Sequence, residues 1–152
     1  MGGRARGPVV PPVGFWDTSA LVPLCVRESR SAHALSLHRQ YEAVVWWAAT
    51  VEVASALARL SRMKLLSPED WVQAQTTASV FANAWTVVAP SNAVRAKAQQ
   101  IVERYDLRAA DAFQLAAALE WCSDAPQGRK FLTADVRLFR AAILSGFDAL
   151  SL

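Results

Sequence analysis

Four acidic residues stand where a fold could bring them together. Asp17 directly follows a short apolar run at 13–16, and Asp135 comes three residues after another run at 130–132. Glu52 and Asp111 interrupt apolar helical stretches, each within the first turns of its predicted helix. Converging carboxylates repel each other and raise each other's pKa, and a bound cation relieves that cost. Hard divalent ions such as Mg²⁺ and Mn²⁺ take such oxygen ligands, so the set predicts a metal site.

Each acid taken alone has a simpler explanation. An Asp or Glu in the first turn of a helix interacts favourably with the helix dipole, by roughly 0.3–1 kcal/mol. Asp17 could act only as an N-cap. No His or Cys cluster competes as a metal site, because His33 and His38 fall on a predicted surface helix where solvated side chains are expected.

The pattern of apolar residues predicts the scaffold that holds these acids. Short apolar runs predict strands at 13–16, 43–47, 85–88, 130–132 and 147–150. Helical spacing and capping residues predict helices at 20–26, 31–41, 49–63, 67–84, 91–105, 108–122 and 135–144. This alternation indicates an α/β fold, with a central, mostly parallel sheet of four to five short strands flanked by helices. Ligands bind such sheets at the carboxyl ends of strands.

Composition favours one folded domain. The 152 residues are 53% hydrophobic and 19% charged, which excludes a disordered chain, and no apolar run reaches the roughly 18 residues of a membrane span. Residues 1–14 are rich in Gly, Arg and Pro without an apolar core, so we expect a flexible arm before a domain at 15–152. Cys25 and Cys122 lack CxxC spacing and are expected to be buried thiols of a cytoplasmic protein.

The charge balance permits a polyanionic partner without requiring one. The net charge is +3, and most of the 16 basic residues are Arg, which suits phosphate but also fits a GC-rich genome. The candidates for a basic rim around the acids are Arg27, Arg30, Arg59, Arg62 and Lys64, although solvated helix faces explain these residues equally well.

For most of the Trp residues we favour core packing over base stacking: Trp46, Trp47, Trp85 and Trp121. Trp16 and Trp71 are the candidates for a place nearer the surface.

Four motifs follow one another along the chain: FWDTSAL at 15–21, Glu52 in an Ala- and Leu-rich helix, DAFQLA at 111–116, and LTAD at 132–135. In this order and spacing they resemble the PIN-domain family, and most of all its VapC-type toxin ribonucleases from toxin–antitoxin pairs. The resemblance covers essentially all of residues 13–152. It implies a single PIN-like domain.

The resemblance implies metal-dependent endonucleolytic cleavage of RNA. Asp17, Glu52, Asp111 and Asp135 match the family's catalytic and metal-binding acids, for one or two Mg²⁺ or Mn²⁺ ions. Ser19 and Thr133 match hydroxyl positions near the metal. Water activated by the metal would attack the phosphorus and leave 5′-phosphate and 3′-hydroxyl ends. Arg108, one turn before Asp111, is a candidate to hold phosphate, although a surface position or a salt bridge explains it as well.

By the same resemblance the partners are RNA, a cognate antitoxin and a second copy of the chain, with DNA reached only through the antitoxin. Two alternatives within the family stay open: a weakly catalytic or non-catalytic module that binds RNA or regulates, and a housekeeping RNA-processing nuclease. A third alternative is a phosphohydrolase with an Asp nucleophile. That class needs a second acid two residues after the first, and Ser19 occupies this position.

Overall fold

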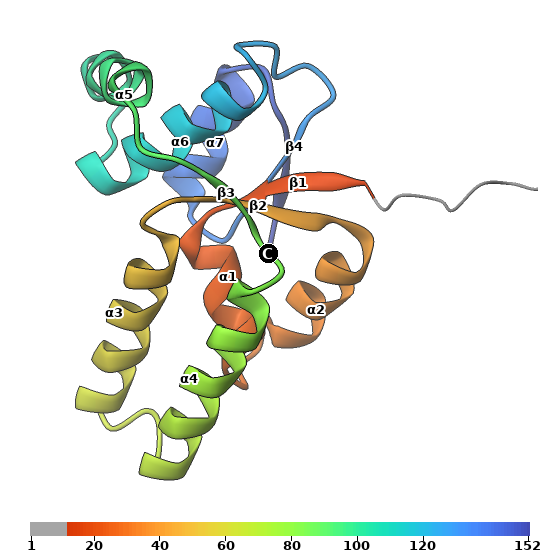
Figure 1. The fold of residues 1–152 in the computed structure, drawn as a ribbon, viewed down its shortest axis with the longest axis vertical. Coiled ribbons are helices and arrows are strands. Elements are labelled where there is room, and N and C mark those ends of the chain that lie inside the picture. Colours follow the sequence, from red (N-terminus) through yellow and green to blue (C-terminus); the bar gives the residue numbers. More distant parts are fainter. Residues whose placement is uncertain (1–11) are drawn as a thin grey trace, which may run out of the picture.

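The computed structural model describes residues 12–152 (Figure 1). The strands are β1 (Val13–Trp16), β2 (Glu42–Trp46), β3 (Thr86–Val88), β4 (Lys130–Thr133) and β5 (Asp148–Ser151). The helices are α1 (Thr18–Cys25), α2 (Ser31–Gln40), α3 (Ala49–Arg62), α4 (Pro68–Ala82), α5 (Asn92–Arg104), α6 (Ala109–Trp121) and α7 (Val136–Leu144). The elements therefore follow the predicted order, and each lies close to its predicted range.

The five strands form one sheet in the order β3-β2-β1-β4-β5, and every neighbouring pair is parallel. In the central strand β1, Phe15 is in register with Val44 on one side and Phe131 on the other. The chain builds outward from β1 to β3 and then crosses back to place β4 beside β1. The carboxyl ends of β1 and β4 therefore meet at the topological switch point, where α/β sheets bind their ligands.

Helices cover both faces of the sheet, as predicted. Alternate strand residues point to opposite faces, so Phe15 and Phe131 pack with α5, α6 and α7. Trp16 and Leu132 pack on the other face with α1, α2, α3 and α4. Figure 1 shows these two helix groups on either side of the strands, with α3 and α4 extending away from the sheet. The sheet is thus a rigid layer whose strand ends present side chains to one edge.

Side-chain caps determine where several helices begin. The carboxylate of Asp17 accepts a hydrogen bond from the Ala20 N–H and starts α1 immediately after β1. Asp135 accepts from the Leu138 N–H and starts α7 soon after β4. Ser67, followed by Pro68, caps α4 on the Asp70 N–H. Two of the four acids singled out in the sequence are therefore helix caps at the strand ends.

Some expectations need correction. Strand β1 begins at Val13, so the last two residues of the predicted arm belong to the sheet, while the first eleven lie outside the described residues. Trp16, expected nearer the surface, is fully buried, and Trp47, expected in the core, is 59% exposed. His38 is not a solvated residue: its ring packs edge-on against Trp16 and Phe81, and burial lowers its pKa.

Both cysteines are free and buried, as predicted. In the described part of the chain, no helix combines the length and the apolar character that crossing a membrane requires.

Candidate active site

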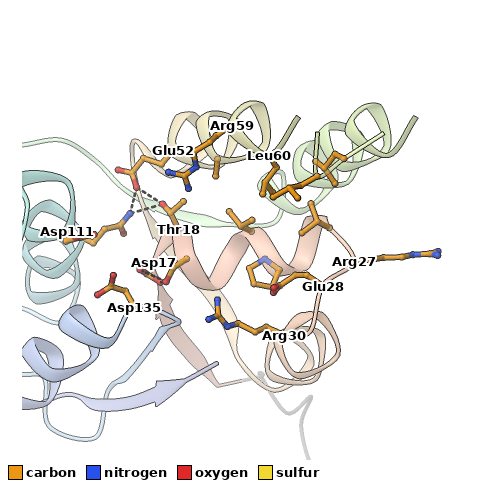
Figure 2. Close-up of a pocket in the computed structure, with 18 residues that line it drawn as sticks. Asp17, Thr18, Arg27, Glu28, Arg30, Glu52, Arg59, Leu60, Asp111 and Asp135 are labelled. Carbon is orange, nitrogen blue, oxygen red and sulfur yellow. Dashed lines mark hydrogen bonds between the residues drawn. The ribbon is translucent and has the colours of Figure 1, made fainter. Parts of the chain in front are cut away.

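A cavity of about 650 Å³ opens at the carboxyl ends of β1 and β4, between α1, α3 and α6 (Figure 2). All four predicted acids line it, although they come from four different parts of the chain: Asp17, Glu52, Asp111 and Asp135. Asp17 and Asp135 come from strand ends, whereas Glu52 and Asp111 come from the first turns of α3 and α6. The fold therefore brings the acids into one site, which we call the acidic cavity.

Asp17 is the most buried acid of the set, with only 3% of the residue exposed. The Ser19 hydroxyl donates to both of its carboxylate oxygens, at 2.8 and 2.9 Å, and the Ala20 N–H donates at 3.1 Å. Burial nevertheless raises the pKa of Asp17 to about 7, because loss of hydration outweighs these hydrogen bonds, and the charge of Asp111 adds to the shift. Among residues 12–152, no Lys, Arg or His forms a salt bridge with this carboxylate.

Glu52 is held by two neighbours whose roles the sequence alone did not reveal. The Thr18 hydroxyl donates to Glu52 Oε2. Gln114 Nε2 donates to the same oxygen at 2.7 Å and to Thr18 Oγ1 at 3.0 Å. Gln114 is 1% exposed, and its Oε1 has no hydrogen-bond partner among the described residues. The sequence did contain one indication of this role: Gln114 is a polar residue among the Ala and Leu residues of α6, three positions after Asp111.

Ser19 and Thr133 join the ends of β1 and β4. The two hydroxyl oxygens lie 3.2 Å apart, and Ser19 Oγ accepts from the Ala134 N–H at 2.8 Å. Thr133 Oγ1 accepts from the Asp135 N–H at 3.0 Å. Thr133 is fully buried behind the acids, while Ser19 lines the cavity. Both predicted hydroxyl residues therefore lie beside the acids and fix the backbone that carries Asp135.

Asp111 experiences the mutual repulsion that the sequence predicted. Burial raises its pKa most, and the negative charges of Asp135 and Glu52 raise it further. Arg108 and Arg137 act in the opposite direction. Burial is also the largest cause for Asp17, so removal from water contributes more than crowding. A cation in the cavity would offset both effects.

The donor set fits a hard divalent cation. Within residues 12–152, no three Asp, Glu, His or Cys side chains are placed to hold one ion together. Mg²⁺ commonly binds only one or two carboxylates and completes its shell with water. The acidic cavity offers carboxylate and hydroxyl oxygens, and burial destabilises the ionised forms of two of its acids, Asp17 and Asp111. This chemistry suits a cation that keeps part of its hydration.

Basic residues surround the acids on one side. Arg27, Arg30 and Arg59 line the acidic cavity, whereas Arg62 and Lys64, predicted with them, lie outside its lining. In Figure 2, Arg30 and Arg59 extend toward the acids and Arg27 points away. Arg108 is exposed at the start of α6, outside the lining but close enough to Asp111 to affect its pKa.

Comparison with known proteins agrees with this geometry. The family model for the PIN domain matches residues 15–144. No protein with a curated description matches the chain. Among solved structures, PAE2754 from Pyrobaculum aerophilum is 16% identical with a TM-score of 0.65, and the match covers 92% of this chain and 89% of that one.

Two further structures share the fold. A toxin–antitoxin complex from Klebsiella pneumoniae contains a chain that is 16% identical with a TM-score of 0.62, covering 91% of this chain and 96% of that one. FitAcB from Neisseria gonorrhoeae gives 17% identity and a TM-score of 0.56, covering 88% of this chain and 96% of that one. The family match spans most of the described fold and all four acids. The chain therefore belongs to the PIN-domain family.

Proposed function

We propose that this protein is an endoribonuclease that depends on Mg²⁺ or Mn²⁺, and that it is the toxin of a toxin–antitoxin pair. One observation carries the proposal: four carboxylates from separate segments line a single cavity at the switch point of a parallel sheet. Such a concentration of negative charge, with the pKa of Asp17 and of Asp111 raised, calls for cations. Membership of the PIN-domain family, whose members are generally nucleases, supports the same reaction.

The residues of the cavity have two kinds of role, ion binding and orientation of the carboxylates. Asp17, Glu52, Asp111 and Asp135 would hold one or two ions, which when bound activate water and stabilise negative charge on the phosphate. Thr18 and Gln114 orient the Glu52 carboxylate, and Ser19 orients that of Asp17. Cleavage leaves 5′-phosphate and 3′-hydroxyl ends.

The arginines support an RNA substrate. Arg30 and Arg59 line the same cavity as the acids, where their guanidinium groups can bind two phosphate oxygens each. They would bring an anionic chain to a site that would otherwise repel it. Arg108, exposed near Asp111, remains a proposed phosphate contact at the edge.

The partners are proposed from the structural neighbours. One neighbour is a toxin–antitoxin complex, and another is FitAB bound to an IR36 DNA fragment, with a TM-score of 0.59 and 16% identity over 90% of this chain and 93% of that one. By analogy, we propose a cognate antitoxin. From the family resemblance described above, we also propose a homodimer and contact with DNA through the antitoxin alone. Two free, buried cysteines accord with a cytoplasmic location, which we also propose.

A second candidate is an RNA-binding or regulatory module with weak or no catalysis. The wide spacing of the acids favours this candidate. Among residues 12–152, no three Asp, Glu, His or Cys side chains lie close enough together to hold one metal ion. An RNA-processing nuclease without an antitoxin is the remaining alternative.

The test is cleavage of total RNA by the purified full chain with Mg²⁺, with Mn²⁺ and with EDTA. Asp111→Asn removes a proposed ligand, and Asp70→Asn, on the surface of α4, is the matched control. Discrete fragments that require metal and Asp111, but not Asp70, support the nuclease, and their ends check the products. Folded protein that binds RNA but does not cut it under any condition would move the assignment to the binding module.

A further inference from the structure

A second cavity adjoins the acidic one. It has a volume of about 830 Å³ and lies where β2 passes into α3, against the start of α5 and α6. The residues that define its character are Trp46, Trp47, Phe113, Arg95, Asn92 and Glu52. We call it the Trp47 cavity. Its volume is within the range of small-molecule sites, roughly 300–1,000 Å³, and is sufficient for a nucleotide.

Trp47 presents a large aromatic surface directly after the end of β2. Its side chain is largely in solvent, although its backbone N–H donates to the Val88 carbonyl at 3.1 Å and is held against β3. Beside it, Trp46 and Phe113 stack with their ring centroids 5.6 Å apart and their planes at 7°. Because a Trp side chain has only two χ angles, it loses little conformational freedom when a flat ligand stacks on it.

The cavity also carries groups that suit a nucleotide. Arg95 contributes a guanidinium, and no carboxylate among residues 12–152 forms a salt bridge with it. Asn92 contributes an exposed amide that can hydrogen-bond a base edge. Aromatic faces combined with cationic groups are how proteins hold single-stranded nucleic acid, through stacked bases and neutralised phosphates.

Glu52 lines both cavities. The two cavities are therefore neighbours, so an RNA chain whose phosphate lies at the acids can extend a neighbouring nucleotide toward Trp47. We infer that the Trp47 cavity is a binding subsite for an unpaired nucleotide next to the cleaved bond, with the base stacked on Trp47 and a phosphate on Arg95. This inference rests on the proposed function, because it takes RNA as the substrate.

The experiment measures binding of a short fluorescein-labelled single-stranded RNA of mixed sequence by fluorescence anisotropy. The full chain carries Asp17→Asn so that the RNA stays intact. Trp47→Ala should weaken binding about tenfold to a hundredfold, since stacking on an aromatic residue contributes on that order. Trp47→Phe keeps a ring and should restore most of the affinity. Val80→Ala, at an exposed position on α4, should change nothing.

Two further measurements sharpen the result. Arg95→Gln should weaken binding at low salt and reduce the slope of log affinity against log salt concentration by about one. A single abasic site is then moved along the RNA. At one position, loss of the base should weaken binding by the Asp17→Asn parent protein but not by its Trp47→Ala derivative, because the two changes remove the same contact.

Other results would overturn the subsite. If the parent protein binds RNA and the Trp47→Ala variant binds it with equal affinity, the proposed subsite is disproved while the proposed function is unaffected. If Trp47→Ala converts a dimer to a monomer in sedimentation and the monomer keeps its affinity for RNA, the face is an interface between copies. If the parent protein neither binds RNA nor, without Asp17→Asn, cleaves it, the subsite and the proposed function both fail.

Discussion

Asp17 connects the chemistry of the site to the stability of the fold. Its pKa rises from 3.8 to about 7 because the carboxyl group is buried. The folded state therefore holds the proton more tightly than the unfolded state. As pH rises from about 4 to about 7, the folded state loses stability relative to the unfolded state, by about 4 kcal/mol in total. Above that range the cost is constant.

Replacing the ionisable group should remove this cost. In metal-free buffer at pH 8, Asp17→Asn should be more stable than the wild type by up to about 4 kcal/mol, whereas near pH 4 the two should be similar. Asn keeps an acceptor for the Ala20 N–H, so the cap on α1 remains. Urea unfolding across this pH range measures the difference. Asp70→Asn is the control, and an Asp17→Asn variant that is less stable at pH 8 would contradict the account.

Gln114 allows a residue-scale test of how Glu52 is oriented. Gln114→Met fills a similar volume but removes the hydrogen bond to Glu52 Oε2. Given the proposed nuclease, kcat should fall about tenfold to a hundredfold, as expected when a hydrogen bond to a charged group is lost. KM should change little, because Gln114 is only 1% exposed and offers almost no surface to a substrate.

Stability distinguishes this positioning role from simple packing. Gln114→Met also removes a buried oxygen without a partner among the described residues, so we expect the free energy of unfolding to stay within about 1 kcal/mol. Gln73→Met, on the exposed surface of α4, should leave both kcat and stability unchanged. A Gln114→Met variant with normal kcat would show that Thr18 alone suffices.

At the scale of elements, the site is built from helix starts. Asp17 caps α1, Asp135 caps α7, and the other two acids lie in the first turns of α3 and α6. The simple explanation of Asp17 as an N-cap is therefore correct, and Asp135 has the same structural role. The capping role does not exclude a role in metal binding, since the remaining carboxylate oxygen of a capping Asp can face the cavity.

Asp135 should show both roles separately. Asp135→Ala removes the acceptor for the Leu138 N–H and should cost about 1 kcal/mol of stability. Asp135→Asn keeps the cap and should cost much less. Both variants should lose RNA cleavage if the charge is what the reaction needs. Thermal unfolding and cleavage assays on the two proteins distinguish these effects, and full activity in Asp135→Asn would remove this residue from the metal site.

At the scale of the whole molecule, a bound cation should stabilise the fold. A ligand that binds only the folded state at a concentration a hundred times its Kd adds about 2.7 kcal/mol, which raises the Tm by several degrees for a chain of this size. Mn²⁺ should therefore raise the Tm of the wild type and of Asp70→Asn. The double variant Asp17→Asn with Asp111→Asn should show no rise. An equal rise in all three proteins would place the ion elsewhere.

The sequence by itself determined much of this protein. Local apolar runs and capping residues predicted the strands and helices, because these depend on neighbouring residues. The alternation of elements predicted the parallel sheet, and two acids at strand ends had to reach its carboxyl edge. The family resemblance connected them with Glu52 and Asp111.

Only the tertiary structure decided which side chains touch. Gln114 reaches Glu52 and Thr18 across 62 and 96 positions, so their contact depends on how α6, α3 and α1 pack together. The same packing buries Trp16, places His38 against it and leaves Trp47 in solvent. Aromatic residues next to a strand end have the same local pattern whether they face the core or a cavity. Their exposure is set by the helices that cover the sheet, which no local pattern encodes.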